Sequence, residues 1–167
     1  MSGAWIVTVG AAQLGAADDP VGMMVARALL AEGVPVASRQ VVDEDETAVE
    51  EALRGAVEAA ALVVVLAQPG GSSGEVVRRA LSRLSGARLV LNDKLLASME
   101  EDFARRGQAM PRRLDRLALL PQGALLWPAA GEPAWVLEVR RAAVAVDLRP
   151  QAHRDGRARP GAGGGRR

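Results

Sequence analysis

Leu62-Val-Val-Val-Leu66, followed by Pro69-Gly-Gly-Ser-Ser-Gly74, is the stretch that decides the fold. Five consecutive apolar residues, three of them Val, predict a short strand that is buried on both faces. The Gly- and Ser-rich segment after it predicts a loop, and residues 75–84 have the pattern of an amphipathic helix. A buried strand, a loop and a helix in this order form the repeating unit of an α/β sheet.

The same alternation continues on both sides of this unit. Trp5–Val9 predicts a first strand, Val21–Ala31 a helix that ends at Gly33, and Val34–Val42 a second strand. The acidic cluster Asp43–Glu46 predicts the start of another helix, because carboxylates are favourable at a helix N-terminus. Later strands are expected at 88–91, 124–126, 135–139 and 144–148, and later helices from Asn92 or Asp93 to Gly107 and over 114–120. This order predicts a three-layer α/β/α sandwich with a mixed, mainly parallel sheet.

Length and composition indicate one globular domain. The chain has 167 residues, 49% of them apolar, which is enough for a single core. No run approaches the roughly 20 apolar residues of a membrane helix, so we expect no membrane partner. Met1 leads into the first strand without a basic segment, so we expect no signal peptide and a cytoplasmic location. The absence of cysteine excludes disulfides, thiol catalysis and cysteine–zinc sites.

Charge divides the chain into a body and a tail. Residues 1–148 carry 15 basic and 19 acidic side chains, whereas residues 149–167 carry six Arg and one Asp. We therefore expect a domain over 1–148 and a disordered tail over 149–167, which has almost no apolar residue to bury. Six arginines without aromatic neighbours predict at most weak electrostatic contact with nucleic acid.

Two loops at strand ends are the candidate sites for chemistry, because ligands of open α/β sheets bind beyond the carboxyl ends of strands. The first begins at Gly10 and contains Asp18 and Asp19, which suit either a divalent metal or a simple helix start. The second combines glycines and hydroxyls before a helix, so it is either an anion-binding loop or an ordinary connection. In it, Ser72 and Glu75 have the spacing of a capping box. Neither loop is a Walker A motif.

A serine-hydrolase mechanism is excluded by the histidine count. His153, in the expected tail, is the only histidine of the chain, so no general base is at hand for a Ser-His-Asp triad in the body.

Four segments of the second half carry a family resemblance. They are Leu89–Leu96, Phe103–Pro111, Ala118–Gly123 and Trp135–Glu138. An Arg-Gly-x-x-Met-Pro segment ending a long helix, followed by Leu-Leu-Pro-x-Gly, resembles the MoaB/Mog-like molybdopterin-binding domains. Among these, the chain is most similar to the N-terminal domain of competence/damage-inducible protein A. The resemblance covers roughly residues 4–140 and implies the fold expected above.

The resemblance also implies that the catalytic loops have changed. The family's Gly-Asp-Glu motif falls on Gly10-Ala11-Ala12, so both of its acids are absent. In the Gly-rich loop, Gly74 stands where the family has its first aspartate. Gly70 is retained, Ser72 replaces a threonine, and Glu75 replaces the second aspartate. Losing carboxylates removes metal ligands and general acid–base groups together.

The resemblance implies binding of a phosphorylated pterin such as molybdopterin, or of a nucleotide, and we expect binding without efficient catalysis. One alternative is a metal-dependent pyrophosphatase acting on ADP-ribose or a related nucleotide, with Asp19 and Glu75 as catalytic and metal-binding groups. The other is a non-catalytic scaffold, and in each case we expect a homo-oligomer. Family members continue into a deamidase domain after this region, so we do not expect nucleotide deamidation. The expected ligand-binding residues are Gly10, Gly70, Gly71, Ser72, Ser73 and Glu75.

Overall fold

The computed structural model describes residues 3–10, 19–67, 72–127 and 134–147. Its elements in chain order are β1 (Ala4–Val9), α1 (Pro20–Ala31), β2 (Val36–Val42), α2 (Glu46–Ala59), β3 (Leu62–Leu66), α3 (Ser72–Ser85), β4 (Leu89–Leu91), α4 (Asp93–Arg105), the 3-10 helix η3 (Arg112–Ala118), β5 (Leu119–Pro121), β6 (Leu125–Trp127), β7 (Ala134–Val139) and β8 (Ala142–Asp147). The expected domain boundary at 148 and the expected tail at 149–167 lie outside the described residues.

Six strands form one sheet in the order β2-β1-β3-β8-β7-β6. β1 pairs in parallel with β2 and β3, and β3 pairs in parallel with β8. β7 runs antiparallel to β8, and β6 antiparallel to β7. The expectation of a mixed, mainly parallel sheet with antiparallel strands late in the chain is therefore confirmed.

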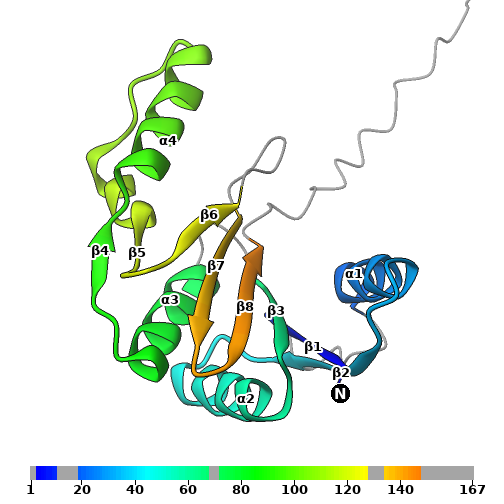
Figure 1. Cartoon of the computed structure of the whole chain (residues 1–167). Helices are drawn as coiled ribbons and strands as arrows, with labels where there is room; N and C mark the ends of the chain where they lie inside the picture. Colours follow the sequence, from blue (N-terminus) through cyan, green and yellow to red (C-terminus); the bar gives the residue numbers. More distant parts are fainter. Residues whose placement is uncertain (1–2, 11–18, 68–71, 128–133, 148–167) are drawn as a thin grey trace, which may run out of the picture.

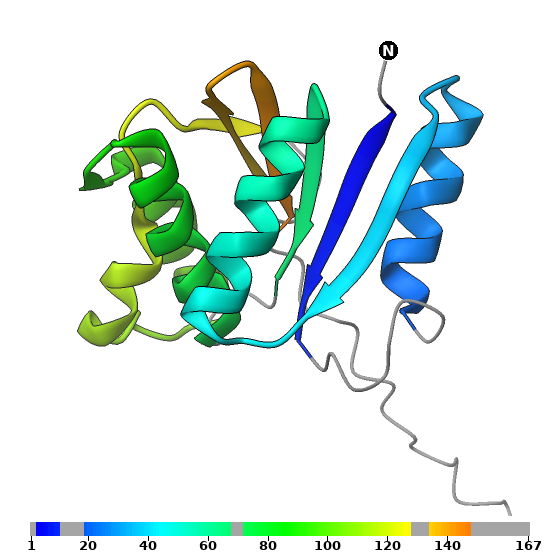
Figure 2. The same cartoon turned by 90° about the horizontal axis from the view of Figure 1, so that it is seen from below.

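Helices cover the sheet from two sides, which produces three layers (Figure 2). α1 lies against β1 and β2 on one face, and α2 and α3 lie on the other. Val63 and Val65 of β3 are fully buried in the larger apolar cluster, which includes residues of α2 and α3. Leu66 instead belongs to the smaller cluster with Ile6 of β1 and Ala26 of α1. The apolar run of β3 thus serves both faces, as its composition predicts.

Helix ends follow the expected local signals. Asp45 caps α2 by accepting a hydrogen bond from the Ala48 amide, and Asn92 caps α4 by accepting one from the Leu95 amide. Gly33 and Gly107 follow α1 and α4 with φ angles of 76° and 68°, which favour glycine at these helix stops. None of the helices in the described ranges combines the length and apolar character needed to cross a membrane.

Two short strands form a separate unit beside the main sheet (Figure 1). β4 and β5 pair antiparallel, with Val90 opposite Leu120. The sequence pattern predicts a helix over 114–120, but helical structure ends at Ala118, and Leu119 and Leu120 belong to β5. Leu119 and Leu120 form a strand because they pair with β4 and because Leu120 is buried. Local periodicity shows neither effect, so it predicts a helix there. Both ends of β3 agree with the expectation, and the other element boundaries differ from it by at most three residues.

The buried face of α2 provides a test of the packing. Leu53 is completely buried between α2 and the sheet, whereas Leu30 on α1 is 57% exposed. Leu53→Ala is expected to lower the free energy of unfolding by about 2–5 kcal/mol, because a buried cavity replaces the side chain. Leu30→Ala should change it by less than about 1 kcal/mol. Urea unfolding followed by tryptophan fluorescence measures both, and equal effects would contradict this packing.

Candidate functional site

The order of the strands creates a switch point between β1 and β3. α1 leaves the carboxyl end of β1 toward one face of the sheet, whereas α3 follows β3 on the opposite face (Figure 2). Segments that diverge in this way leave room at the carboxyl edge, which is where ligands bind in open α/β sheets. We call the carboxyl ends of β1 and β3, with the N-termini of α1 and α3, the switch-point site.

Gly10 closes the β1 side of this site. Its amide donates a hydrogen bond to the Val42 carbonyl of β2 at 2.8 Å. A Cβ atom placed on Gly10 would meet no atom of the described residues within 4 Å. Ala11 and Ala12, where the family has its acids, lie outside the described residues.

Asp19 holds the start of α1 against the end of β1. Its Oδ1 accepts a hydrogen bond from the Gly22 amide at 3.0 Å, and its Oδ2 accepts one from Thr8 Oγ1 at 2.6 Å. The residue is only 8% exposed. Asp19 is therefore the N-cap of α1, and both carboxylate oxygens have partners within the protein.

Gly22 is required for this arrangement. A Cβ atom at Gly22 would collide with the Asp19 carboxylate and would lie 3.2 Å from Thr8 Oγ1. Any larger residue must displace the carboxylate or the first turn of α1. We call Thr8, Asp19 and Gly22 the interlocked unit. Their spacing in the sequence does not indicate that the three residues are in contact.

The α3 side of the site contains the two expected serines. Ser72, the first residue of α3, donates a hydrogen bond from its Oγ to the carboxylate of Glu44. Ser73 is fully buried and already engaged in an interaction. Gly70 and Gly71 lie outside the described residues. Of the proposed anion-binding loop, the structure therefore describes only the helical end.

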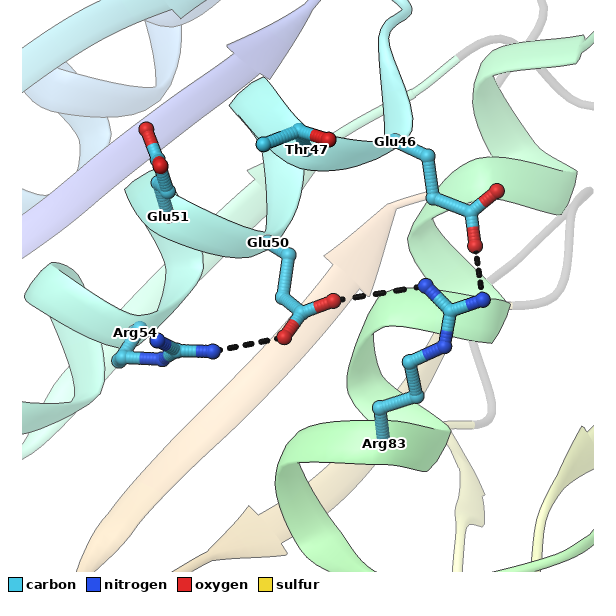
Figure 3. A pocket seen from close by; sticks show the side chains of 6 residues that line it. All are labelled: Glu46, Thr47, Glu50, Glu51, Arg54 and Arg83. Carbon is cyan, nitrogen blue, oxygen red and sulfur yellow. Dashed lines mark hydrogen bonds and ion pairs between the residues drawn. The ribbon is translucent and has the colours of Figure 1, made fainter.

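Glu75 belongs to a network of ion pairs between α2 and α3. Its carboxylate is 3.4 Å from Arg79, which also lies 3.9 Å from Glu46. Arg83 contacts both Glu46 and Glu50, and Arg54 reaches Glu50 as well (Figure 3). An open groove between the two helices is lined by Glu46, Thr47, Glu50, Glu51, Arg54 and Arg83. Arg83 of α3 pairs with two carboxylates of α2, so the ion pairs in this groove hold the two helices together.

The two expected metal ligands have other partners. Asp19 is engaged by Thr8 and Gly22, and Glu75 by Arg79. Within the described ranges, no three His, Asp or Glu side chains are grouped so that they could hold a metal ion. The residues described at the switch-point site therefore do not fit a divalent cation.

Arg78 is a buried charged residue of α3 that the sequence pattern does not single out. It lies on α3 with only 3% of its surface exposed, on the side of the helix that also carries Gly74 and Leu81. Burial lowers the pKa of its guanidinium, Glu75 raises it, and the neighbouring Arg116 and Arg79 lower it. The sequence does contain one sign of this burial: Arg78 lies at helical spacing on the same stripe of α3 as Gly74 and Leu81.

The cap of α1 provides a test of these local interactions. Asp19→Ala is expected to cost about 2–3 kcal/mol, because it removes a helix cap and leaves the buried Thr8 hydroxyl without its acceptor. Asp45→Ala removes the exposed cap of α2 and should cost only about 1 kcal/mol. Urea unfolding of both variants checks the difference. A cost of Asp19→Ala no greater than that of Asp45→Ala would argue against the Thr8 interaction.

The sequence is similar to that of known proteins over most of its length. A family model described as "Probable molybdopterin binding domain" matches residues 5–148. A CinA-like protein of Geobacter metallireducens is 32% identical over 115 residues, which cover 69% of this chain and 28% of that protein. A CinA-like protein of Geobacter sulfurreducens is 34% identical over 112 residues, which cover 67% of this chain and 27% of that protein. The chain thus corresponds to little more than a quarter of these relatives.

Solved structures share the fold. CinA from Thermoplasma acidophilum, described as having unknown function, has a TM-score of 0.72 at 21% identity, covering 86% of this chain and 85% of that one. A molybdopterin biosynthesis protein from Mycobacterium abscessus has a TM-score of 0.51 at 18% identity, covering 86% and 79%. Because the family model spans β1 to β8 and the architecture agrees with it, this chain belongs to the molybdopterin-binding domain family, as a relative of the CinA-like proteins.

Proposed function

We propose that the chain binds a phosphorylated pterin or nucleotide at the switch-point site, without efficient catalysis. The observation that supports binding is the divergence of α1 and α3 toward opposite faces at the carboxyl ends of β1 and β3. Family membership supports the choice of ligand. In both ligand types a flat heterocycle carries a phosphate, and α3 directs its N-terminal amides toward the same edge of the sheet.

The engaged carboxylates support the absence of efficient turnover. Metal-dependent pyrophosphate hydrolysis needs carboxylates that are free to hold a cation or to accept a proton. Asp19 caps a helix and Glu75 pairs with Arg79. Ala11, Ala12 and Gly74 cannot replace the acids that the family carries at these positions.

Binding is tested by thermal unfolding with AMP, ADP-ribose or a pterin phosphate. A ligand at 100 times its dissociation constant is expected to stabilise the protein by about 2.7 kcal/mol. Ser72→Asp should weaken binding, because a second carboxylate beside Glu44 repels the phosphate. Ser98→Asp, an exposed position on α4, is the matched control and should bind as the wild type does. The proposal fails if none of these ligands shifts the wild-type transition.

Catalysis is tested on the same protein with ADP-ribose and either Mg²⁺ or Co²⁺. The proposal expects no release of AMP above the uncatalysed background, and no effect of Glu75→Ala. Release of AMP that disappears in Glu75→Ala would instead establish the pyrophosphatase alternative.

A second proposal, self-association, is favoured by an uncovered part of the sheet. On the α1 side, α1 packs against β1 and β2 and its apolar cluster includes Val64 and Leu66 of β3, whereas β8, β7 and β6 lie beyond it. Leu125 and Trp127 of β6 are 72% and 58% exposed. The pairing register places these residues of the three strands on one face: Leu125, Trp127, Ala134, Val136, Glu138, Ala143 and Ala145.

We propose that a second copy of the chain covers this open sheet face. Six of these seven residues are apolar and Glu138 is charged, so this set is as apolar as an interface core. β7 separates the small residues on β8 from the large ones on β6, and this difference in size across the face allows two copies to interdigitate around a twofold axis. β6 is also the last strand of the sheet, so its outer edge can pair with the same strand of the partner.

Light scattering at micromolar concentration tests self-association. The wild type is expected to be a dimer or larger, and Leu125→Glu should shift it to a monomer by burying a charge at the contact. Leu30→Glu, at an exposed apolar position on α1, should leave the mass unchanged. A monomeric wild type would overturn this proposal and leave the ligand-binding proposal intact.

A further inference from the structure

The outer side of α1 is more apolar than that of the other helices. α1 carries a single charged residue, Arg27, whereas α2, α3 and α4 each carry four or more. On the side of α1 that faces away from its own sheet, Met24, Ala28 and Ala31 are exposed. A helix that is apolar around its whole circumference is normally buried on all sides. The composition of α1 therefore indicates a second contact, which no described part of the single chain provides.

α1 and the open sheet face lie next to each other on the same side of the sheet. α1 packs on β1 and β2, and β8, β7 and β6 extend this side of the sheet beyond it. A twofold axis that runs parallel to the strands, at the level of α1, turns a second copy face to face with the first. The α1 helix of each copy then lies over β8 and β7 of the other. Ala143 and Ala145 of β8 leave room for the close approach of a helix.

Each of these two surfaces carries one charge, and the two charges have opposite signs. Arg27 is the charged residue of α1, and Glu138 is that of the open sheet face. Both residues are exposed, and neither forms an ion pair within the described ranges. Complementary charges fix which surfaces meet and in which register.

Arg27 and Glu138 also lie at similar heights along the strands. Gly22 of α1 lies beside Thr8, near the carboxyl end of β1. Five further residues of helix bring Arg27 roughly 7.5 Å closer to the amino end. Glu138 lies level with Leu62, the first residue of β3, through their common neighbour on β8. A twofold axis parallel to the strands preserves these heights, so it brings Arg27 of one copy near Glu138 of the other.

We propose that α1 of a second copy covers the open sheet face, and that Arg27 of each copy pairs with Glu138 of the other. The inference rests on the proposed self-association, which it deepens by naming the helix that forms the contact. The exposed side of α1 is apolar, its one charge complements that of the face, and both surfaces lie on one side of the sheet. In this arrangement the outer edge of β6 stays unpaired.

A charge reversal on each surface tests the pairing. Sedimentation equilibrium of the full chain measures the dissociation constant of the dimer for the wild type, Arg27→Glu, Glu138→Arg and the double variant. Each single reversal brings like charges together twice in the dimer, so the dissociation constant should rise about tenfold or more. The double variant restores opposite charges and should return to within about threefold of the wild type. Arg88→Glu, at an exposed arginine outside both surfaces, is the control and should behave as the wild type.

Two apolar residues of α1 test how the helix is oriented. Parallel strands are joined by right-handed connections, so the turn of α1 directs Met24 toward β3 and the open sheet face, and Leu30 toward the outer edge of β2. The two residues are 56% and 57% exposed, so they tolerate substitution equally well in the single chain. Met24→Glu should weaken the dimer about tenfold or more, because it buries a charge at the contact, and Leu30→Glu should not. Equal effects of the two substitutions would overturn the inference.

The outcomes distinguish this inference from the proposals on which it builds. If the wild type is a dimer that Leu125→Glu dissociates, but the double reversal gives no recovery and Met24→Glu has no effect, another element covers the face. Only the inference about α1 then fails. A monomeric wild type overturns both this inference and self-association. Neither result affects the proposed ligand binding, which thermal unfolding with AMP, ADP-ribose or a pterin phosphate tests separately.

Discussion

The structure depends on β3 having a partner on each edge and apolar cover on each face. Val63 lies opposite Trp5 of β1 and Val144 of β8, so the two ends of the domain meet on one five-residue strand. With β1 between β2 and β3, the helices that follow β1 and β3 must leave toward opposite faces. The switch-point site is therefore a consequence of the strand order, and its position does not depend on which residues the loops contain.

The acidic and basic groups at this edge are distributed differently from what a metal site needs. The carboxylate of Asp19 caps α1, and the carboxylate of Glu75 takes part in the ion pairs that join α2 to α3. Arg78 has no comparable partner in the described ranges. The carboxylates of Asp19 and Glu75 thus contribute to the fold.

Local signals account for most of what the sequence predicts correctly. The apolar run of β3, the glycine stops of α1 and α4 and the acidic start of α2 each depend on a few neighbouring residues. The pairing of β4 with β5 and the contact between Ser72 and Glu44, 28 residues apart, depend on distant segments that no local pattern reveals. The burial of Arg78 could not be predicted for another reason. Arginine is usually exposed, so its burial becomes visible only when α3 is packed against its neighbours.

The interlocked unit of Thr8, Asp19 and Gly22 has a consequence for how such a domain can change. Gly10 is tied to β2 through the Val42 carbonyl, and Asp19 is tied to β1 through Thr8. Both ends of the segment between them are thus anchored by residues outside that segment. Substitutions, insertions or a transplanted loop at 11–18 can alter what the site accepts while the anchors keep β1 and α1 in register. Such a boundary lets new specificity arise by exchange of a single segment.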